Sequence, residues 1–172
     1  MDKDGRVFIL VGHGTPASDT PRALLARWKT LEGQRRAERK AMTDEEWRLD
    51  RTIRNWPRTP STDPYQAGMD EIADRLRSRI GRVLVAYNEF CAPSLEDALT
   101  VLATEGVRNV TVVTTMVTPG GVHSEIEIPE ALRAFAQEHP EMRIRYAWPF
   151  DLDEVAALLA ITCREARGLD IH

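Results

Sequence analysis

The sequence contains few of the residues that would indicate a disulfide framework or a cysteine metal site. Its 172 residues include only two cysteines, Cys91 and Cys163, which lie far apart and form no CxxC pair. This spacing argues against an iron–sulfur cluster or a cysteine zinc site and predicts reduced thiols. A chain of this length buries enough apolar surface to fold without disulfides or a structural metal.

The sequence also lacks a long apolar run and an excess of positive charge. The first five residues are polar, so no signal peptide is expected, and no stretch approaches the ~18 apolar residues of a membrane span. Lys+Arg 23 against Asp+Glu 27 gives a net charge of -4, which provides no general attraction for nucleic acid or an anionic membrane. We therefore expect a cytoplasmic protein with one domain over residues 1–172 and with no nucleic-acid or membrane partner.

What the sequence does contain is an alternation of short apolar strands and amphipathic helices. Val, Ile and Thr enrichment predicts strands over 6–11, 82–86, 109–117 and 143–147. Apolar residues at helical spacing predict helices over 65–80, 94–106, 129–139 and 153–167. Parallel neighbours need helical crossovers, so this order predicts an α/β fold. We expect a three-layer, flavodoxin-like domain with a four-stranded parallel sheet in the order 2-1-3-4 and helices on both faces.

The segment 22–64 interrupts this alternation directly after the first strand. Its first part has helical spacing, whereas Glu32–Lys40 is charged nearly all round and is expected to project into solvent. Thr43 followed by three acidic residues is typical of a helix start, and a loop rich in Pro, Thr and Ser ends at Pro64. We predict a helical insertion, a hairpin of two helices followed by a loop.

Two histidines follow predicted strands directly. His13 lies between Gly12 and Gly14 after the first strand, and His123 follows a Pro-Gly-Gly turn after the third. In the order 2-1-3-4 these strands are neighbours, so both histidines reach the sheet edge where open α/β folds bind ligands. Imidazole binds divalent metals and carries protons near neutral pH. A lone histidine beside glycines is more often packed or solvated, but two at one edge indicate a metal or catalytic site.

Acidic residues accompany the histidines. Glu89 lies in the exit loop of the second strand, and Glu125 and Glu127 follow His123. Acids at a helix start are also favoured by the helix dipole, so this structural role stays open for all three. For Glu125 the structural role is at least as well supported as a role in the site.

These motifs together resemble the small class II tetrapyrrole chelatases, the sirohydrochlorin cobaltochelatases and ferrochelatases of the CbiX type. The resemblance covers most of the chain outside 22–64. It rests on Gly12-His13-Gly14, on 86–99 (AYNEFCAPSLEDAL) with its glutamate, and on 121–129, where Gly-x-His is followed by an acid, Ile and Pro. The acid here is Glu127, where the family usually has Asp.

The resemblance implies a chelatase-like fold and a lyase that inserts Co²⁺ or Fe²⁺ into sirohydrochlorin or a related tetrapyrrole, in cobalamin or siroheme biosynthesis. It implies that His13 and His123 bind the metal and remove pyrrole protons, and that Glu89 assists. With Glu127 added, the expected metal ligands are His13, His123 and Glu127. The divalent ion, Co²⁺, Fe²⁺ or Ni²⁺, is the substrate, and no organic cofactor is expected.

A flat macrocycle that carries carboxylates needs an apolar wall and hydrogen-bond donors. The expected substrate-binding residues lie at the exits of the first and third strands: Gly12, Gly14, Ser18, Thr115, Met116, Gly120 and Gly121. The macrocycle is also wide for the mouth of one sheet, and the larger chelatases that this chain resembles use two such halves. We therefore expect a homodimer. Its candidate contacts are aromatic: Trp28, Trp47, Trp56, Trp148 and Phe150.

Two other functions stay open. A histidine phosphotransfer enzyme would use His13 as its nucleophile. However, no arginine directly precedes this histidine as a phosphate clamp, and no P-loop is present. A non-enzymatic tetrapyrrole or metal carrier would keep the same fold and ligands without turnover. The residues do not choose among cobalt, iron and nickel, because imidazole and carboxylate accept all three ions.

Overall fold

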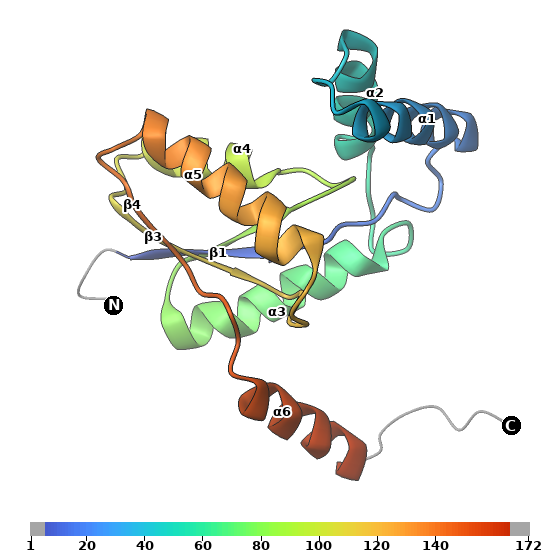
Figure 1. Cartoon of the computed structure of the whole chain (residues 1–172). Coiled ribbons are helices and arrows are strands. Elements are labelled where there is room, and N and C mark those ends of the chain that lie inside the picture. The colour runs from blue at the N-terminus through green and yellow to red at the C-terminus, as the bar shows by residue number, and fades with distance from the viewer. Residues whose placement is uncertain (1–5, 166–172) are drawn as a thin grey trace, which may run out of the picture.

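The computed structural model of the chain describes residues 6–165 and is built around a parallel sheet (Figure 1). The sheet has four strands in the order β2-β1-β3-β4. The strands are β1 (Val7–Gly12), β2 (Val83–Tyr87), β3 (Asn109–Thr114) and β4 (Arg143–Tyr146). The helices are α1 (Arg22–Glu38), α2 (Asp44–Arg54), α3 (Pro64–Ile80), α4 (Leu95–Thr104), α5 (Ile128–Glu138) and α6 (Leu152–Glu165), and a π-helix, η1, spans His123–Glu127. The predicted α/β fold and strand order are confirmed.

The strands alternate their side chains between two apolar layers. On one face, Ile9 of β1 is buried with Leu99 of α4 and Leu132 of α5. On the other face, Leu10 is buried with Met69 of α3. Successive side chains of a strand point to opposite faces, so two neighbouring residues serve two cores. The result is the expected three-layer arrangement, with helices on both faces of the sheet.

The third strand is shorter than predicted and ends at Thr114 instead of residue 117. The hydroxyl of Thr114 donates to the carbonyl oxygen of Val11 at 3.0 Å and accepts the backbone N–H of Met116 at 3.1 Å. The backbone N–H of Thr115 donates to the same carbonyl oxygen at 3.0 Å, which is the last bond of the β1–β3 ladder. The chain turns away from the sheet at this point and is free to form the loop that leads to His123.

The segment 22–64 forms two helices and a loop, as its local patterns predict. Most of Glu32–Lys40 is exposed, as expected, and α1 continues through it to Glu38. Arg35 donates to the buried carboxylate of Glu46 at 2.8 Å and so ties α1 to α2. Trp28 is also buried, and its ring lies 5.1 Å from that of Phe90 in the exit loop of β2.

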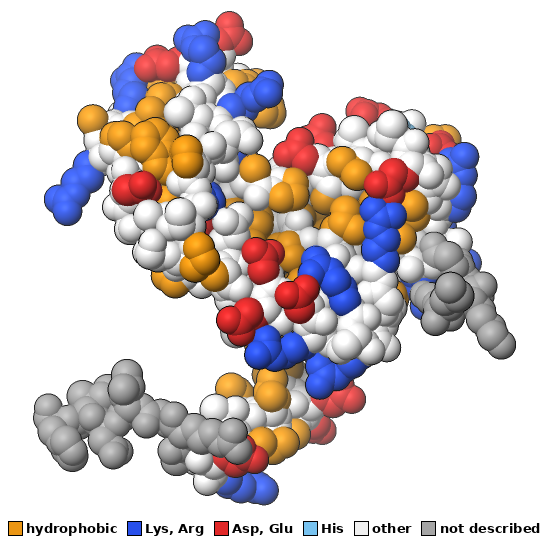
Figure 2. Space-filling view, turned by 180° about the vertical axis from the view of Figure 1, so that it is seen from behind, with side chains coloured by type: hydrophobic (Ala, Val, Ile, Leu, Met, Phe, Trp, Pro, Cys, Tyr) orange, Lys and Arg blue, Asp and Glu red, His pale blue; other side chains and the backbone are white. Residues whose placement is uncertain are grey.

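The last helix, α6, buries none of its residues. Figure 1 shows it standing away from the sheet, and Figure 2 shows hydrophobic side chains gathered on it. Four of its apolar residues are 52% to 65% exposed: Leu152, Leu158, Leu159 and Ile161. The predicted helix is present up to residue 165, and the last two predicted residues lie outside the described residues. Among residues 6–165, no helix is both long and apolar enough to cross a bilayer.

Both cysteines are free thiols. Cys163 is exposed on α6, whereas Cys91 is buried in the exit loop of β2. Burial raises the pKa of the Cys91 thiol to about 11. Its S–H donates to the carbonyl oxygen of Thr15 at 3.3 Å. Cys91 is therefore a packed, protonated thiol that links the first two exit loops.

The core predicts where the fold is sensitive to substitution. Leu99 is 1% exposed under the sheet, so Leu99→Ala is expected to lower the free energy of unfolding by about 2–5 kcal/mol. Val101 lies on the same helix and is 48% exposed, so Val101→Ala should change the free energy of unfolding by less than about 0.5 kcal/mol. Urea unfolding followed by circular dichroism measures both values. Equal losses in the two variants would contradict this assignment of the core.

Candidate metal site

The backbone fixes the ring of His13 at the end of β1. Nδ1 of His13 lies 2.8 Å from the carbonyl oxygen of Gly14. A carbonyl oxygen only accepts, so Nδ1 carries the hydrogen and Nε2 keeps a free lone pair. Nε2 lies 3.9 Å from Oε2 of Glu89. The backbone N–H of His13 donates to the hydroxyl of Tyr65 at 2.9 Å, which ties this turn to α3.

Side chains, in contrast, fix the ring of His123. Its Nδ1 lies 2.7 Å from Oε2 of Glu127, at the other end of η1. The side-chain amide of Asn88 donates to the same oxygen at 2.9 Å. Because the two donors share one acceptor, Asn88 Nδ2 and His123 Nδ1 lie only 2.6 Å apart. An ionised carboxylate cannot donate, so Nδ1 carries the hydrogen and Nε2 is again the free ring nitrogen.

The electrostatics of Glu127 agree with an ionised carboxylate. Its partial burial acts to raise the pKa. The hydrogen bonds from Asn88 and His123 and the nearby charge of Arg36 outweigh this effect, so the pKa of Glu127 lies below its usual range. The carboxylate is therefore available as an acceptor for His123 at neutral pH.

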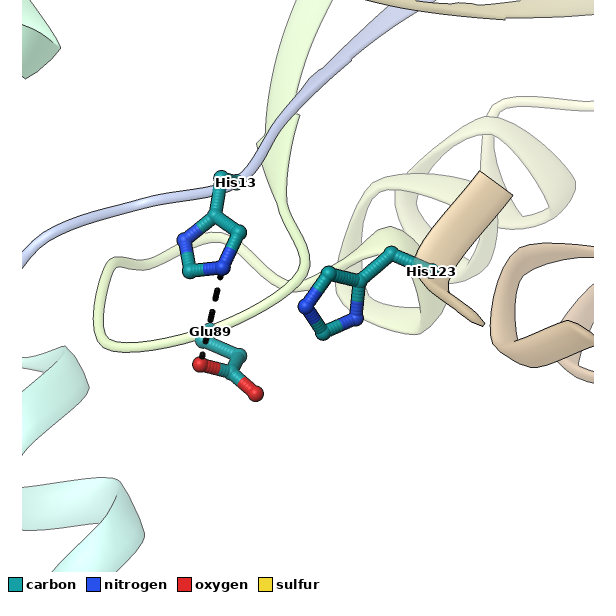
Figure 3. Close-up of side chains that lie close together, drawn as sticks. All are labelled: His13, Glu89 and His123. Atoms are coloured by element: carbon teal, nitrogen blue, oxygen red, sulfur yellow. Dashed lines mark ion pairs between the residues drawn. The ribbon is translucent and has the colours of Figure 1, made fainter. Parts of the chain in front are cut away.

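The side chains of His13, Glu89 and His123 converge on one point (Figure 3). One potential ligand atom from each lies within 4.8 Å of the others. The two imidazole rings meet edge to face, with centroids 4.8 Å apart. Ligands that share an ion through bonds of about 2.1 Å lie up to about 4.2 Å apart, so small side-chain rotations suffice to bring all three onto one ion. The arrangement provides three ligands and leaves further coordination positions open.

Direct contact between two exit loops holds His13 next to Glu89. The backbone N–H of Asn88 donates to the carbonyl oxygen of Gly12 at 2.9 Å, and that of Glu89 donates to the carbonyl oxygen of His13 at 2.8 Å. Gly14 has a φ of +92°, and a Cβ there would lie 1.9 Å from the carbonyl oxygen of Glu89. Only glycine permits this approach.

The segment 22–64 supports the same loop from outside. Arg54 donates to the carbonyl oxygens of Asn88 at 2.8 Å and Cys91 at 3.0 Å. Arg58 donates to the carbonyl oxygen of Phe90 at 2.6 Å and forms a buried ion pair with Asp63. The loop that carries Glu89 is therefore held between β1 and the segment 22–64.

Helix α1 also brings a cation to the site. Nη2 of Arg36 lies 3.6 Å from Oε1 of Glu89 and 3.5 Å from Oε1 of Glu127. It also lies 2.9 Å from Oε1 of Glu32, one turn earlier on α1. Nothing in the sequence pattern separates Arg36 from its charged neighbours, so we did not predict it. Asn88 was also missed, although it directly precedes Glu89 in the same exit loop.

The predicted acidic residues take different places. Glu89 belongs to the convergent group with the two histidines, whereas Glu127 lies behind His123 and is not part of that group. The side chain of Glu125 bonds to the loop before His123, where it accepts the backbone N–H of Gly120 at 2.8 Å. This contact matches the structural role that stayed open for Glu125.

The predicted substrate-binding residues lie on two sides of the site. Gly12 and Gly14 form the turn around His13, and Thr115 and Met116 leave β3 half-buried. Gly120 and Gly121 are exposed in the loop before His123. Ser18 lies further along the chain, is exposed, and donates its backbone N–H to the carbonyl oxygen of Thr62. The structure therefore places Ser18 on the path to α1, beside the loop at residue 62.

Comparison with known proteins relates both the sequence and the fold to one group. A family model described as CbiX matches residues 61–166, more than half of the chain, a range that includes Glu89, His123 and Glu127 but begins after His13. The chain is similar to a crystal structure described as a putative cobalamin (vitamin B12) biosynthesis CbiX protein from Marinobacter aquaeolei VT8, with 20% identity, 94% of each chain covered and a TM-score of 0.54.

A second solved structure is the sirohydrochlorin chelatase SirB from Bacillus subtilis subspecies spizizenii in complex with cobalt. Here the identity is 16% and the TM-score is 0.46, with 92% of this chain and 50% of that chain covered. A search of curated proteins found no significant match.

The close approach of Gly14 to the carbonyl oxygen of Glu89 leads to a prediction about metal binding. Gly14→Ala is expected to push the Glu89 loop away from His13 and to weaken Co²⁺ binding by about tenfold or more, because groups that position ligands contribute on this scale. Titration of the protein with Co²⁺, followed by visible absorbance, measures the affinity. The matched control is Gly33→Ala on α1, where an added Cβ meets nothing within 4 Å. Unchanged affinity in Gly14→Ala would contradict the assigned geometry.

Proposed function

The chain belongs to the CbiX family, and we propose that it is a chelatase, a lyase that inserts Co²⁺ or Fe²⁺ into sirohydrochlorin or a related tetrapyrrole. The observation that carries this proposal is the convergence of His13, His123 and Glu89 at the carboxyl edge of the sheet. Each of these side chains both binds a divalent ion and accepts a proton. Ni²⁺ suits the same ligands and belongs in the same test.

The chemistry of insertion explains a site with three ligands. The ion must lose its water, and the macrocycle must lose two N–H protons as two metal–nitrogen bonds replace its two N–H bonds. A closed cage of four protein ligands would hold the ion too firmly, whereas His13, His123 and Glu89 leave positions for macrocycle nitrogens. As these side chains release the ion, they become bases able to accept the two protons.

Asn88 and Glu127 have a positioning role in this proposal. The side-chain amide of Asn88 donates to Oε2 of Glu127. The same oxygen accepts the Nδ1 hydrogen of His123 at 2.7 Å. An acceptor on one ring nitrogen fixes the tautomer and strengthens the other nitrogen as a ligand. Glu127 thus acts on the metal through His123, and Glu89 takes the place of the third ligand.

We further propose that residues 1–172 form one domain and that 22–64 is an insertion serving as a wall beside the site. The α1–α2 pair forms a lobe, and a hollow lies between part of this lobe and the rest of the molecule (Figure 2). A groove of about 840 Å³ lies between α2 and the starts of α4 and α5, and Trp47, Asn88 and Ile128 are among its lining residues. Asn88 borders both this groove and the candidate metal site, which supports a role for the insertion in binding a large substrate.

The histidines provide the direct test of the proposed function. His13→Ala and His123→Ala are each expected to abolish accelerated metal insertion, and Glu89→Ala should reduce it less, because water partly replaces a carboxylate base. The measurement is the absorbance spectrum of sirohydrochlorin during anaerobic incubation with Co²⁺, Fe²⁺ or Ni²⁺.

His139→Ala is the matched control for this test, because His139 stacks on Phe135 with ring centroids 4.3 Å apart, at the last turn of α5. Wild-type rates in His13→Ala or His123→Ala would overturn the site assignment. Saturable binding of metal and macrocycle by the wild type without a metallated spectrum would identify a carrier in place of an enzyme.

We also propose a homodimer. The exposed apolar side chains of α6 include Leu158 and Ile161, and no contact within residues 6–165 buries them. A second copy would cover such a surface. Among the aromatic residues predicted for the contact, Trp28 is buried in its own subunit, whereas Trp47 is 52% exposed.

Light scattering tests the dimer. At micromolar concentration we expect a mass near twice the 19.5 kDa of one chain. The double variant Leu158→Lys, Ile161→Lys should have the mass of one chain, because two charges would enter an apolar contact. Val101→Lys changes a half-exposed apolar residue on α4 and is the control. A wild-type mass near one chain at all concentrations would rule out the dimer.

A further inference from the structure

Arg36 lies where a divalent ion would compete with it. Its guanidinium is within 3.6 Å of one carboxylate oxygen of Glu89 and within 3.5 Å of one of Glu127. Glu89 belongs to the group that could hold the ion, and Glu127 orients the ring of His123. A positive charge here partly neutralises the two acids that make the site attractive to a metal. An ion bound beside Glu89 would in turn repel the guanidinium.

The insertion holds Arg36 close to the site without fixing its guanidinium there. Its neighbour Arg35 forms the pair with Glu46, whose side chain is only 1% exposed, and so sets how α1 lies on α2. Arg36 itself is 48% exposed, and its shortest bonds run to Glu32 on the same helix, at 2.9 to 3.0 Å. Glu32 uses only part of the guanidinium, which has five N–H donors. The remaining donors are free to change partner when the site fills.

We propose that Arg36 is an exchangeable cation of the metal site. In the metal-free protein it pairs with Glu89 and Glu127, and when a divalent ion binds it turns to a peripheral carboxylate of the macrocycle. This inference rests on the proposed function, since the carboxylates are those of the tetrapyrrole substrate. A guanidinium matches a carboxylate with two parallel hydrogen bonds. Metal binding would thereby prepare the site for the macrocycle.

Two measurements on Arg36→Ala test the exchange. Without its competing cation the variant should bind Co²⁺ roughly fivefold more tightly in the absence of macrocycle, the scale of a partly exposed ion pair. Its KM for sirohydrochlorin at saturating Co²⁺ should rise roughly tenfold, because a charge-assisted bond to the substrate is lost, while kcat changes much less. Visible absorbance follows both the Co²⁺ titration and the turnover.

Two further variants separate exchange from a general effect of charge. Arg36→Lys keeps the charge, so its Co²⁺ affinity should stay near that of the wild type, while its KM still rises because an ammonium lacks the planar fork. Lys40→Ala removes the same charge four residues further on, where the lysine is 72% exposed and pairs with Glu38. This control should change neither value.

Unchanged or weaker Co²⁺ binding in Arg36→Ala would overturn the exchange, and so would an unchanged KM. The Co²⁺ titration requires no turnover, so it distinguishes this failure from that of the proposed function. A wild-type protein that binds Co²⁺ but never forms a metallated macrocycle would contradict the chelatase assignment. The affinity difference between wild type and Arg36→Ala would still report on the pairing of Arg36 with the site carboxylates.

Discussion

The two backbone hydrogen bonds between the exit loops of β1 and β2 are the constraint on which the candidate site depends. Within the sheet, β1 and β2 run in parallel register as far as Gly12 and Tyr87. The bonds to Gly12 and His13 from the next two residues of the β2 exit continue this pairing beyond the strands. His13 and Glu89 therefore lie side by side because the sheet extends to them, and little conformational freedom is lost when they bind an ion together.

His123 reaches the site in a different way. β1 and β3 stop pairing at Val11 and Thr114, where the hydroxyl of Thr114 also donates to the carbonyl oxygen of Val11. A loop then leads to η1, and the ring of His123 takes its position from Asn88 and Glu127. One half of the site is thus held by backbone and the other half by side chains.

Local patterns in the sequence were sufficient for the fold and for the positions of both histidines. β1, β2 and β3 are short runs rich in Val, Ile, Leu or Thr, and a histidine that follows such a strand has its place set by the strand order. The roles of Asn88 and Arg36 could not be predicted in this way, because they depend on contacts with residues 35 to 91 positions away. Glu127 differs, because it lies only four residues after His123, but a helix-start acid and a partner of His123 have the same local sequence.

The charged part of α1 contains two arginines whose different roles composition alone does not separate. Arg35 and Arg36 are adjacent in the sequence, yet one pairs with a buried carboxylate and the other is half-exposed beside the candidate site. Successive residues of a helix point in different directions, so one turn of a charged helix can face both a partner helix and a binding site. The pair of Arg35 with Glu46 is costly to break, because it would leave a buried charge without a partner. Arg36, with carboxylates on several sides and solvent on another, can change partner at little cost. In the proposed chelatase these two arginines would have different roles, because Arg35 holds α1 against α2 and Arg36 would change partner as the ion enters the site.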